Sequence, residues 1–269
     1  MGRRLCLGDI HGMYSRLTDV LDKCKFSSSD ILYCVGDLCD RGNENLKTLN
    51  FLMSLKNFYP VIGNHDIWLA QYLSYKMPEN TFKIWAYHNG GMNTFLEFLD
   101  MPDEEKLKIY NWMKNIPYII ELDNKIIIHT PTPKKIFKRL KSGYSLEEIT
   151  LANIRESGLL QDEIYDDDLW NRKVISCSKY VNDKQKYKKF FETQFNKKSP
   201  IIFSGHTPLF DPVYDENMNI CLIDTGSFAT KEKDGKDGHI TIIDIDTFDY
   251  WQNGKRKKQN LLDDMKSRK

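Results

Sequence analysis

Three short apolar runs in the first quarter of the chain each end in a glycine that is followed at once by a polar residue. The runs are Leu5–Leu7, Ile31–Val35 and Phe58–Ile62, and apolar residues with helical spacing occupy the two stretches between them. This alternation predicts parallel strands joined by right-handed crossovers. Such sheets bind ligands beyond the carboxyl ends of their strands, which is where these polar residues would lie.

The later part of the chain predicts a second group of elements. Residues 116–122 and 125–128 predict a hairpin that turns at Asp123-Asn124. Strand-like runs then predict a second, antiparallel or mixed sheet formed by 201–204, 220–224 and 239–245. The helices expected from apolar spacing or from a capping signature are 66–75, 92–115 with a break near Pro102, 145–157 and 183–196.

Five segments with side chains that can bind metal follow one another along the chain. They are Gly8-Asp9-Ile10-His11-Gly12, Gly36-Asp37-Leu38-Cys39-Asp40-Arg41-Gly42, Gly63-Asn64-His65-Asp66, His129 after an apolar run, and Gly205-His206-Thr207-Pro208. Carboxylate, imidazole and amide oxygen donors suit manganese, iron or zinc in a reactive site better than a structural zinc, which favours thiolates. One such segment alone would most often be a turn. Five together predict a shared metal site.

The spacing of these residues suits a site with two divalent metal ions. Asp9 and His11 can face one ion from a single loop, and Asp37 can bridge both ions with its two oxygens. The second ion can be completed by later residues, namely Asn64, His129 and His206. Two ions about 3.5–4 Å apart would clamp an in-line displacement at phosphorus and turn a bridging water into hydroxide.

Residues beside these candidate ligands can handle a proton and a phosphate. His65 could protonate the leaving oxygen, and Asp40 is available to fix its tautomer. Arg41 follows directly, and a guanidinium there can bind two phosphate oxygens in a fork. The simpler alternatives are a structural hydrogen bond for His65 and a salt bridge that caps the loop for Arg41.

The order of these motifs resembles the phosphoprotein phosphatase family of calcineurin-like metallophosphoesterases, in particular its lambda-phosphatase-like bacterial and phage branch. Further segments match that branch, among them Trp170-Asn171-Arg172 before His206 and Asp224-Thr225-Gly226 after it. The resemblance spans roughly residues 5–230. It implies an α/β fold of the α/β/β/α sandwich type, with two central mixed sheets flanked by helices.

The same resemblance implies a role for each matching residue. One metal ion would be bound by Asp9, His11 and Asp37, and the other by Asp37, Asn64, His129 and His206. His65 and Asp40 would form the catalytic acid pair, and the substrate phosphate would be held by Arg41, Arg172 and Asn64. Manganese is the expected metal, with iron or zinc as alternatives.

The substrate is left open between two classes. The leading interpretation is a serine/threonine protein phosphatase-like enzyme that hydrolyses phosphate monoesters, because Trp170-Asn171-Arg172 matches that branch. The alternative is a symmetrical bis(5'-nucleosyl)-tetraphosphatase, that is, a diadenosine tetraphosphate hydrolase. That sister branch often has aspartate where Asp66 stands, whereas protein phosphatases usually have glutamate. Pro208 replaces the second histidine of a Gly-His-x-His motif, which argues against the nuclease and phosphodiesterase branches. A non-catalytic metal-bound interaction module is disfavoured because the motif set is complete.

Composition bounds the organisation of the chain and its partners. The whole of 1–269 is expected to form a single metallophosphoesterase domain, with a cap or insertion at about 131–170 and a polar tail from about 255. A net charge of +1 provides no long-range attraction for nucleic acid.

No apolar run approaches the length of a membrane span. The six cysteines include no Cys-x-x-Cys pair, which fits reduced thiols in a cytoplasm. A phosphorylated protein or peptide, or a small phosphoester, is the expected substrate partner, and the oligomeric state is left open.

Overall fold

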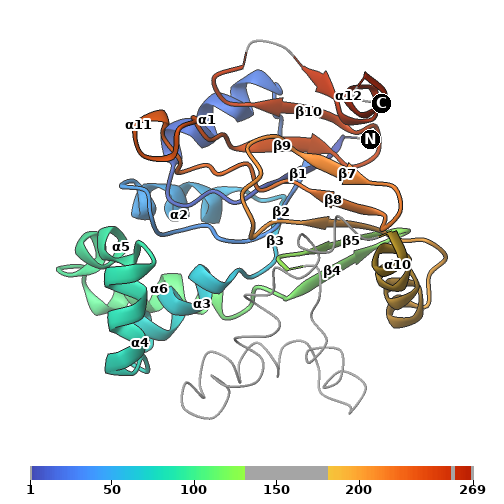
Figure 1. Cartoon of the computed structure of the whole chain (residues 1–269). Coiled ribbons are helices and arrows are strands. Elements are labelled where there is room, and N and C mark those ends of the chain that lie inside the picture. Colours follow the sequence, from blue (N-terminus) through green and yellow to red (C-terminus); the bar gives the residue numbers. More distant parts are fainter. Residues whose placement is uncertain (1, 131–180, 256–257, 268–269) are drawn as a thin grey trace.

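Two mixed β-sheets flanked by helices form the fold in the computed structural model, which describes residues 2–130, 181–255 and 258–267 (Figure 1). The expected cap at 131–170, the helix expected at 145–157 and the Trp170-Asn171-Arg172 segment lie outside the described residues. The expectation of two central mixed sheets between helices is confirmed.

The first sheet contains the parallel strands that the opening of the sequence predicts. β1 (Arg4–Leu7) pairs in parallel with β2 (Ile31–Cys34), and β2 with β3 (Phe58–Pro60). On the other side of β1 the sheet continues with antiparallel strands from the end of the chain, which are β9 (Thr241–Asp244), β10 (Asp249–Gln252) and β11 (Gln259–Asn260). The assignment of 239–245 to the second sheet was therefore wrong, because an alternating strand pattern does not specify which neighbour it will pair with.

The second sheet has the order β4-β5-β6-β8-β7. The predicted hairpin is confirmed as β4 (Ile119–Leu122) and β5 (Lys125–Ile128), which pair antiparallel around Asp123-Asn124. β5, β6 (Ile201–Ser204) and β8 (Ile220–Leu222) are parallel, and β7 (Val213–Asp215) is an antiparallel edge strand.

Strand side chains alternate between two apolar clusters because successive residues of a strand point to opposite faces. One cluster joins the facing sides of the two sheets, with members such as Cys6, Tyr33, Ile127, Phe203, Cys221 and Ile243. The residues next to them, such as Leu5, Leu32, Ile126 and Ile202, belong to a second cluster that also contains helix residues. Both faces of each sheet are thus buried, which fixes the strand register.

Helices cover the sheets and also form a group of their own. α1 (Tyr14–Lys23) and α2 (Asn45–Ser54) contribute buried residues such as Leu17 and Leu49 to the second cluster. The broken helix expected at 92–115 is confirmed as α5 (Gly91–Phe98) and α6 (Asp103–Met113), with Pro102 capping the second. The remaining helices are α3 (Asn64–Leu73), α4 (Glu79–Lys83), the π-helical turn η1 (Ile84–His88), α10 (Val181–Phe195), α11 (Lys231–Asp234) and α12 (Leu261–Ser267).

The group formed by α3, α4, η1, α5 and α6 lies to one side of the sheets (Figure 1). Its centre is an aromatic cluster in which Trp68, Trp85 and Ala86 are buried against Tyr72 and Phe95. η1 is not expected from the sequence, and its turn places the fully buried Trp85 beside the candidate site. Among the helices of the described ranges, none is long and apolar enough to cross a membrane.

Candidate metal centre

The candidate ligands follow the carboxyl ends of parallel strands from both sheets. In the first sheet, Asp9 and His11 follow β1, Asp37 follows β2 and Asn64 follows β3. In the second sheet, the residues that follow β5 and β6 are His129 and His206. Parallel neighbours end at the same edge of a sheet, so the fold gathers residues that are far apart in sequence. His206 and Asp9, 197 positions apart, are joined by a hydrogen bond from the His206 N–H to Asp9 Oδ2 at 3.1 Å.

Glycines allow the two sheets to approach each other closely at this edge. A Cβ atom on Gly205 would lie 2.0 Å from Asp9 Oδ1, and one on Gly8 would lie 2.2 Å from the carbonyl oxygen of Ile223. Real Cβ atoms do not make such contacts. Gly8 before Asp9 and Gly205 before His206 are therefore required by the close packing of the strand ends, which the Gly-Asp and Gly-His pairs signal in the sequence.

Four of the candidate ligands, Asn64 among them, lie close together. The Asn64 Oδ1 atom lies 2.9 Å from His129 Nε2 and 3.0 Å from His206 Nδ1, and His129 Nε2 lies 3.5 Å from Asp37 Oδ2. The ligand atoms of Asp37, His129 and His206 all lie within 4.8 Å of one another, and all three residues are buried. The residues expected at the second metal ion are therefore together.

The tautomer of His129 shows what this cluster can bind. His129 Nδ1 lies 2.8 Å from the carbonyl oxygen of Val35, so Nδ1 carries the proton and donates it. Burial lowers the pKa of His129 to about 4, which keeps the ring neutral and leaves Nε2 as an acceptor. That acceptor faces the acceptor oxygens of Asn64 and Asp37. Converging acceptors repel one another unless a cation lies among them, so this donor set fits a divalent metal ion.

His11 approaches the same oxygen of Asp37 with the same tautomer. Its Nδ1 donates to the carbonyl oxygen of Cys39 at 2.9 Å, and its Nε2 lies 3.7 Å from Asp37 Oδ2. Burial keeps the pKa of His11 well below its usual value. Ligand atoms of His11, Asp37 and His65 form a second group within 4.8 Å. Asp9 is not part of either group among the described residues, and lies instead beside the backbone of His206.

The two residues predicted as an acid pair, His65 and Asp40, are in contact and fully buried. His65 Nδ1 lies 2.7 Å from Asp40 Oδ2, and Asp40 accepts two further hydrogen bonds, from Trp85 Nε1 at 2.7 Å and from Thr94 Oγ1 at 2.6 Å. Burial raises the pKa of Asp40 to about 7, against the effect of these donors. Neither Trp85 nor Thr94 is expected here from the sequence, because neither belongs to a motif and both come from the helical group.

Arg41 bridges the two parts of the site. Its Nη1 atom lies 3.1 Å from His11 Nε2 and its Nη2 atom 3.1 Å from His65 Nε2. Its guanidinium carbon lies 4.2 Å above the ring of Phe228, a residue that the sequence analysis did not single out. Stacking of this kind fixes the plane of a guanidinium. Arg172, the other predicted phosphate ligand, lies outside the described residues.

Several of these residues adopt a backbone conformation that favours glycine. The φ angles are +50° at His11, +51° at Asp37, +73° at Asp40, +67° at Arg41 and +72° at His206. Each such residue costs about 1–3 kcal/mol and persists only where its surroundings enforce it. At this site the enforcing contacts include Asp66, whose carboxylate accepts the N–H groups of Asp37, Leu38 and Gly63 at 2.8–2.9 Å.

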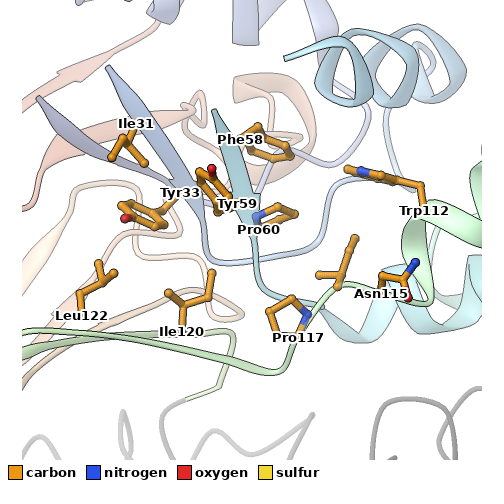
Figure 2. A pocket seen from close by; sticks show the side chains of 11 residues that line it. Ile31, Tyr33, Phe58, Tyr59, Pro60, Trp112, Asn115, Pro117, Ile120 and Leu122 are labelled. Carbon is orange, nitrogen blue, oxygen red and sulfur yellow. The ribbon is translucent and has the colours of Figure 1, made fainter. Parts of the chain in front are cut away.

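A separate apolar pocket of about 520 Å³ lies away from this chemistry (Figure 2). Ile31 and Phe58, which begin β2 and β3, line it together with Trp112 and Leu122. The candidate ligands follow the opposite ends of the same strands. The pocket is therefore not part of the candidate metal centre, despite its size.

Comparisons with known proteins agree with the geometry. The model of the calcineurin-like phosphoesterase family matches residues 2–226. A symmetrical bis(5'-nucleosyl)-tetraphosphatase from Coxiella burnetii (strain Dugway 5J108-111) is 35% identical over 149 residues, which cover 54% of this chain and 47% of that protein. The match therefore spans about half the length of this curated relative.

Solved structures with low sequence identity share the fold. A cold-active protein-tyrosine phosphatase from a Shewanella species superposes with a TM-score of 0.69 and 16% identity, over 97% of this chain and 80% of that one. A protein serine/threonine phosphatase from Saccharomyces cerevisiae gives a TM-score of 0.53 and 13% identity, over 91% and 73% of the two chains. At these identities the likeness concerns the fold alone.

Proposed function

The chain belongs to the calcineurin-like phosphoesterase family, and from this premise we propose that it is a metal-dependent hydrolase that cleaves dinucleoside tetraphosphates symmetrically. The observation that carries the metal-dependent part is the convergence of His11 Nε2 and His129 Nε2 on Asp37 Oδ2, at 3.7 Å and 3.5 Å. Neutral imidazoles whose Nδ1 protons are held by backbone carbonyls present Nε2 to a cation, as metal-binding histidines do.

The proposed ligands are those that the family resemblance implies. One ion would be held by Asp9, His11 and Asp37, and the other by Asp37, Asn64, His129 and His206. A bound pair of ions supplies charge neutralisation at phosphorus and an activated water. Manganese suits this mixture of carboxylate, imidazole and amide donors, and iron or zinc are the alternatives. Metal identity and a cytoplasmic location both stay predictions.

The other residues act directly on the substrate. Arg41 Nη1 donates to His11 Nε2 at 3.1 Å, and if that nitrogen were a metal ligand, the Arg41 N–H would be available to hold a phosphate oxygen. The Nδ1–H of His65 donates to Asp40, which leaves Nε2 to carry an additional proton. That proton can be passed to the leaving oxygen. The ionised Asp40 stabilises the imidazolium that forms when His65 carries both protons.

The sequence favoured a phosphate monoester as substrate, whereas we now place the dinucleoside tetraphosphate first. The curated relative with 35% identity is a symmetrical tetraphosphatase, and Asp66 agrees with that branch. This support is stronger than that for the protein phosphatase interpretation, which depends on the Trp170-Asn171-Arg172 match. Hydrolysis of phosphate monoesters remains the second candidate on the strength of that segment.

A comparison of substrates and metal states tests the proposal. Purified chain would be loaded with Mn²⁺ or stripped with a chelator, and offered diadenosine tetraphosphate, p-nitrophenyl phosphate and a phosphoserine peptide, with products separated by chromatography. We expect metal-dependent conversion of the dinucleotide to ADP as the sole nucleotide product. ATP and AMP would contradict symmetrical cleavage. Faster turnover of the monoesters would establish the second candidate, and no turnover of any substrate would refute the hydrolase.

Replacement of His65 tests the proton transfer. General acid catalysis typically contributes about 10²–10⁴ in rate, so His65→Asn should lower kcat by roughly that factor on the phosphoserine peptide, whose alkoxide is a poor leaving group. The loss should be smaller on the dinucleotide, because a nucleoside diphosphate leaves readily. His88→Asn, an exposed histidine of η1, is the control and should leave both rates unchanged.

A further inference from the structure

The end of β8 resembles the other strand ends of the candidate metal centre but has no role assigned to it. Among the parallel strands of the described ranges, β1, β2, β3, β5 and β6 are each followed by a candidate metal ligand. β8 is parallel to β6 and is followed two residues later by Asp224. This is the same offset that separates the end of β6 from His206.

Asp224 is a buried carboxylate that is only half satisfied. Its side chain is almost fully buried, with 1% of the residue exposed. Oδ1 accepts the N–H of Gly226 at 2.9 Å, whereas Oδ2 is buried and has no hydrogen-bond partner among the described residues. Leaving a buried charged oxygen without a partner is costly, so the turn formed by Oδ1 does not by itself explain why this residue is an aspartate.

The contact between the strand ends places Asp224 beside Asp9. A Cβ atom on Gly8 would lie 2.2 Å from the carbonyl oxygen of Ile223 and 3.6 Å from Asp224 Cα, so the chain before Asp9 touches the chain before Asp224. Asp9 and Asp224, each 1% exposed, therefore follow strand ends that touch.

We propose that Asp224 is a further carboxylate of the metal centre, whose Oδ2 atom contributes to holding the ion next to Asp9 and His11. This proposal rests on the proposed function, because it requires the metal site. It also accounts for Asp9, which lies outside the groups of converging ligand atoms among the described residues. A cation between Asp9 and Asp224 would satisfy both buried carboxylates.

Metal binding by an isosteric variant tests the role. Asp224→Asn keeps an oxygen for the Gly226 N–H but replaces the charged Oδ2. Mn²⁺ would be titrated into metal-free protein by calorimetry, with bound Mn²⁺ counted by electron paramagnetic resonance. We expect one of two binding events to weaken about 10- to 100-fold, the usual effect of removing a residue that supports a metal site. The other event should change much less.

The control is a carboxylate with the same local geometry. Asp244 is also buried, and its Oδ1 accepts the N–H of Asp246 at 2.9 Å, two residues ahead, as Asp224 does with Gly226. It pairs with Leu5 at the start of β1, at the edge opposite to Asp9. Asp244→Asn should leave both Mn²⁺ binding events unchanged.

Stability of the metal-free protein separates a metal role from a purely structural one. Removing a charge from a repelling carboxylate group should leave metal-free Asp224→Asn at least as stable to urea as the wild type, while reducing the stabilisation by Mn²⁺. Asp224→Ser, which can still form the turn, provides a second variant if the first folds poorly. Wild-type Mn²⁺ affinities in either folded variant would overturn the role of Asp224. Failure of the wild type to bind Mn²⁺ would instead overturn the metal-dependent function, and with it this proposal.

Discussion

Replacing Thr94 with valine isolates one hydrogen bond to the carboxylate that supports His65. Thr94 is fully buried on α5, and its hydroxyl donates to Asp40 Oδ1 at 2.6 Å. Valine has nearly the same shape, so Thr94→Val leaves no large cavity. Asp40 stays in place because its other oxygen still accepts hydrogen bonds from His65 and Trp85. The variant therefore removes a donor and little else.

The free energy of unfolding lost in Thr94→Val depends on whether Asp40 is ionised. A hydrogen bond to a charged group contributes about 1.5–3 kcal/mol, and one between neutral groups about 0.5–1.5 kcal/mol. Burial raises the folded-state pKa of Asp40 to about 7, and the Thr94 hydroxyl lowers it from what it would otherwise be. Thr94→Val therefore raises that pKa further. The lost free energy of unfolding should be largest above pH 7, where the wild-type carboxylate is ionised, and should shrink as the pH falls.

Urea unfolding of metal-free protein measures this dependence. We expect Thr94→Val to cost about 2–3 kcal/mol at about pH 8.5 and about 1 kcal/mol at about pH 5.5. Thr48→Val is the matched control, because Thr48 is also fully buried but donates to the backbone oxygen of Glu44, which does not titrate. A cost for Thr94→Val that equals the control and does not vary with pH would refute the account of Asp40 as a buried anion.

Two further substitutions test the geometry of the centre. Gly205→Ala would place a Cβ atom 2.0 Å from Asp9 Oδ1. We expect it to weaken Mn²⁺ binding, measured by calorimetry, by more than about tenfold, the lower range for loss of a supporting contact. Gly235→Ala is the control, because nothing lies within 4 Å of that position, and it should leave Mn²⁺ binding unchanged. Phe228→Leu removes the ring beneath Arg41, a contact worth about 0.5–2 kcal/mol, so the inhibition constant of inorganic phosphate should rise about two- to thirtyfold. An unchanged constant would show that Phe228 does not orient Arg41.

The fold could be predicted wherever local pattern and pairing coincide. The first three strands follow one another with a helix between each pair, and that spacing dictates parallel neighbours. The last strands also have strand-like sequences, but no helix between them dictates which strands become neighbours. Residues 241–244 therefore look like members of the second sheet in the sequence, although they pair with β1 through Leu5 and Leu7.

The candidate site shows the same division. His11, Asp37 and His129 could be found because each belongs to a short motif after a strand, and the fold brings them together. Residues that support these side chains have no such signature. Thr94 is 54 positions from Asp40, and only the packing of the helical group against the sheet edge makes them neighbours.

The joining of Asp9 to His206 across 197 positions has a consequence for how the protein acquires its metal. A nascent chain that ends shortly after the first three strands contains Asp9, Asp37 and Asn64. It still lacks His129 and His206. Contacts of such long sequence separation form late, because closing the intervening loop is entropically costly. Metal capture should therefore coincide with the final docking of the two sheets, so that Mn²⁺ slows unfolding of the finished protein more than it speeds folding.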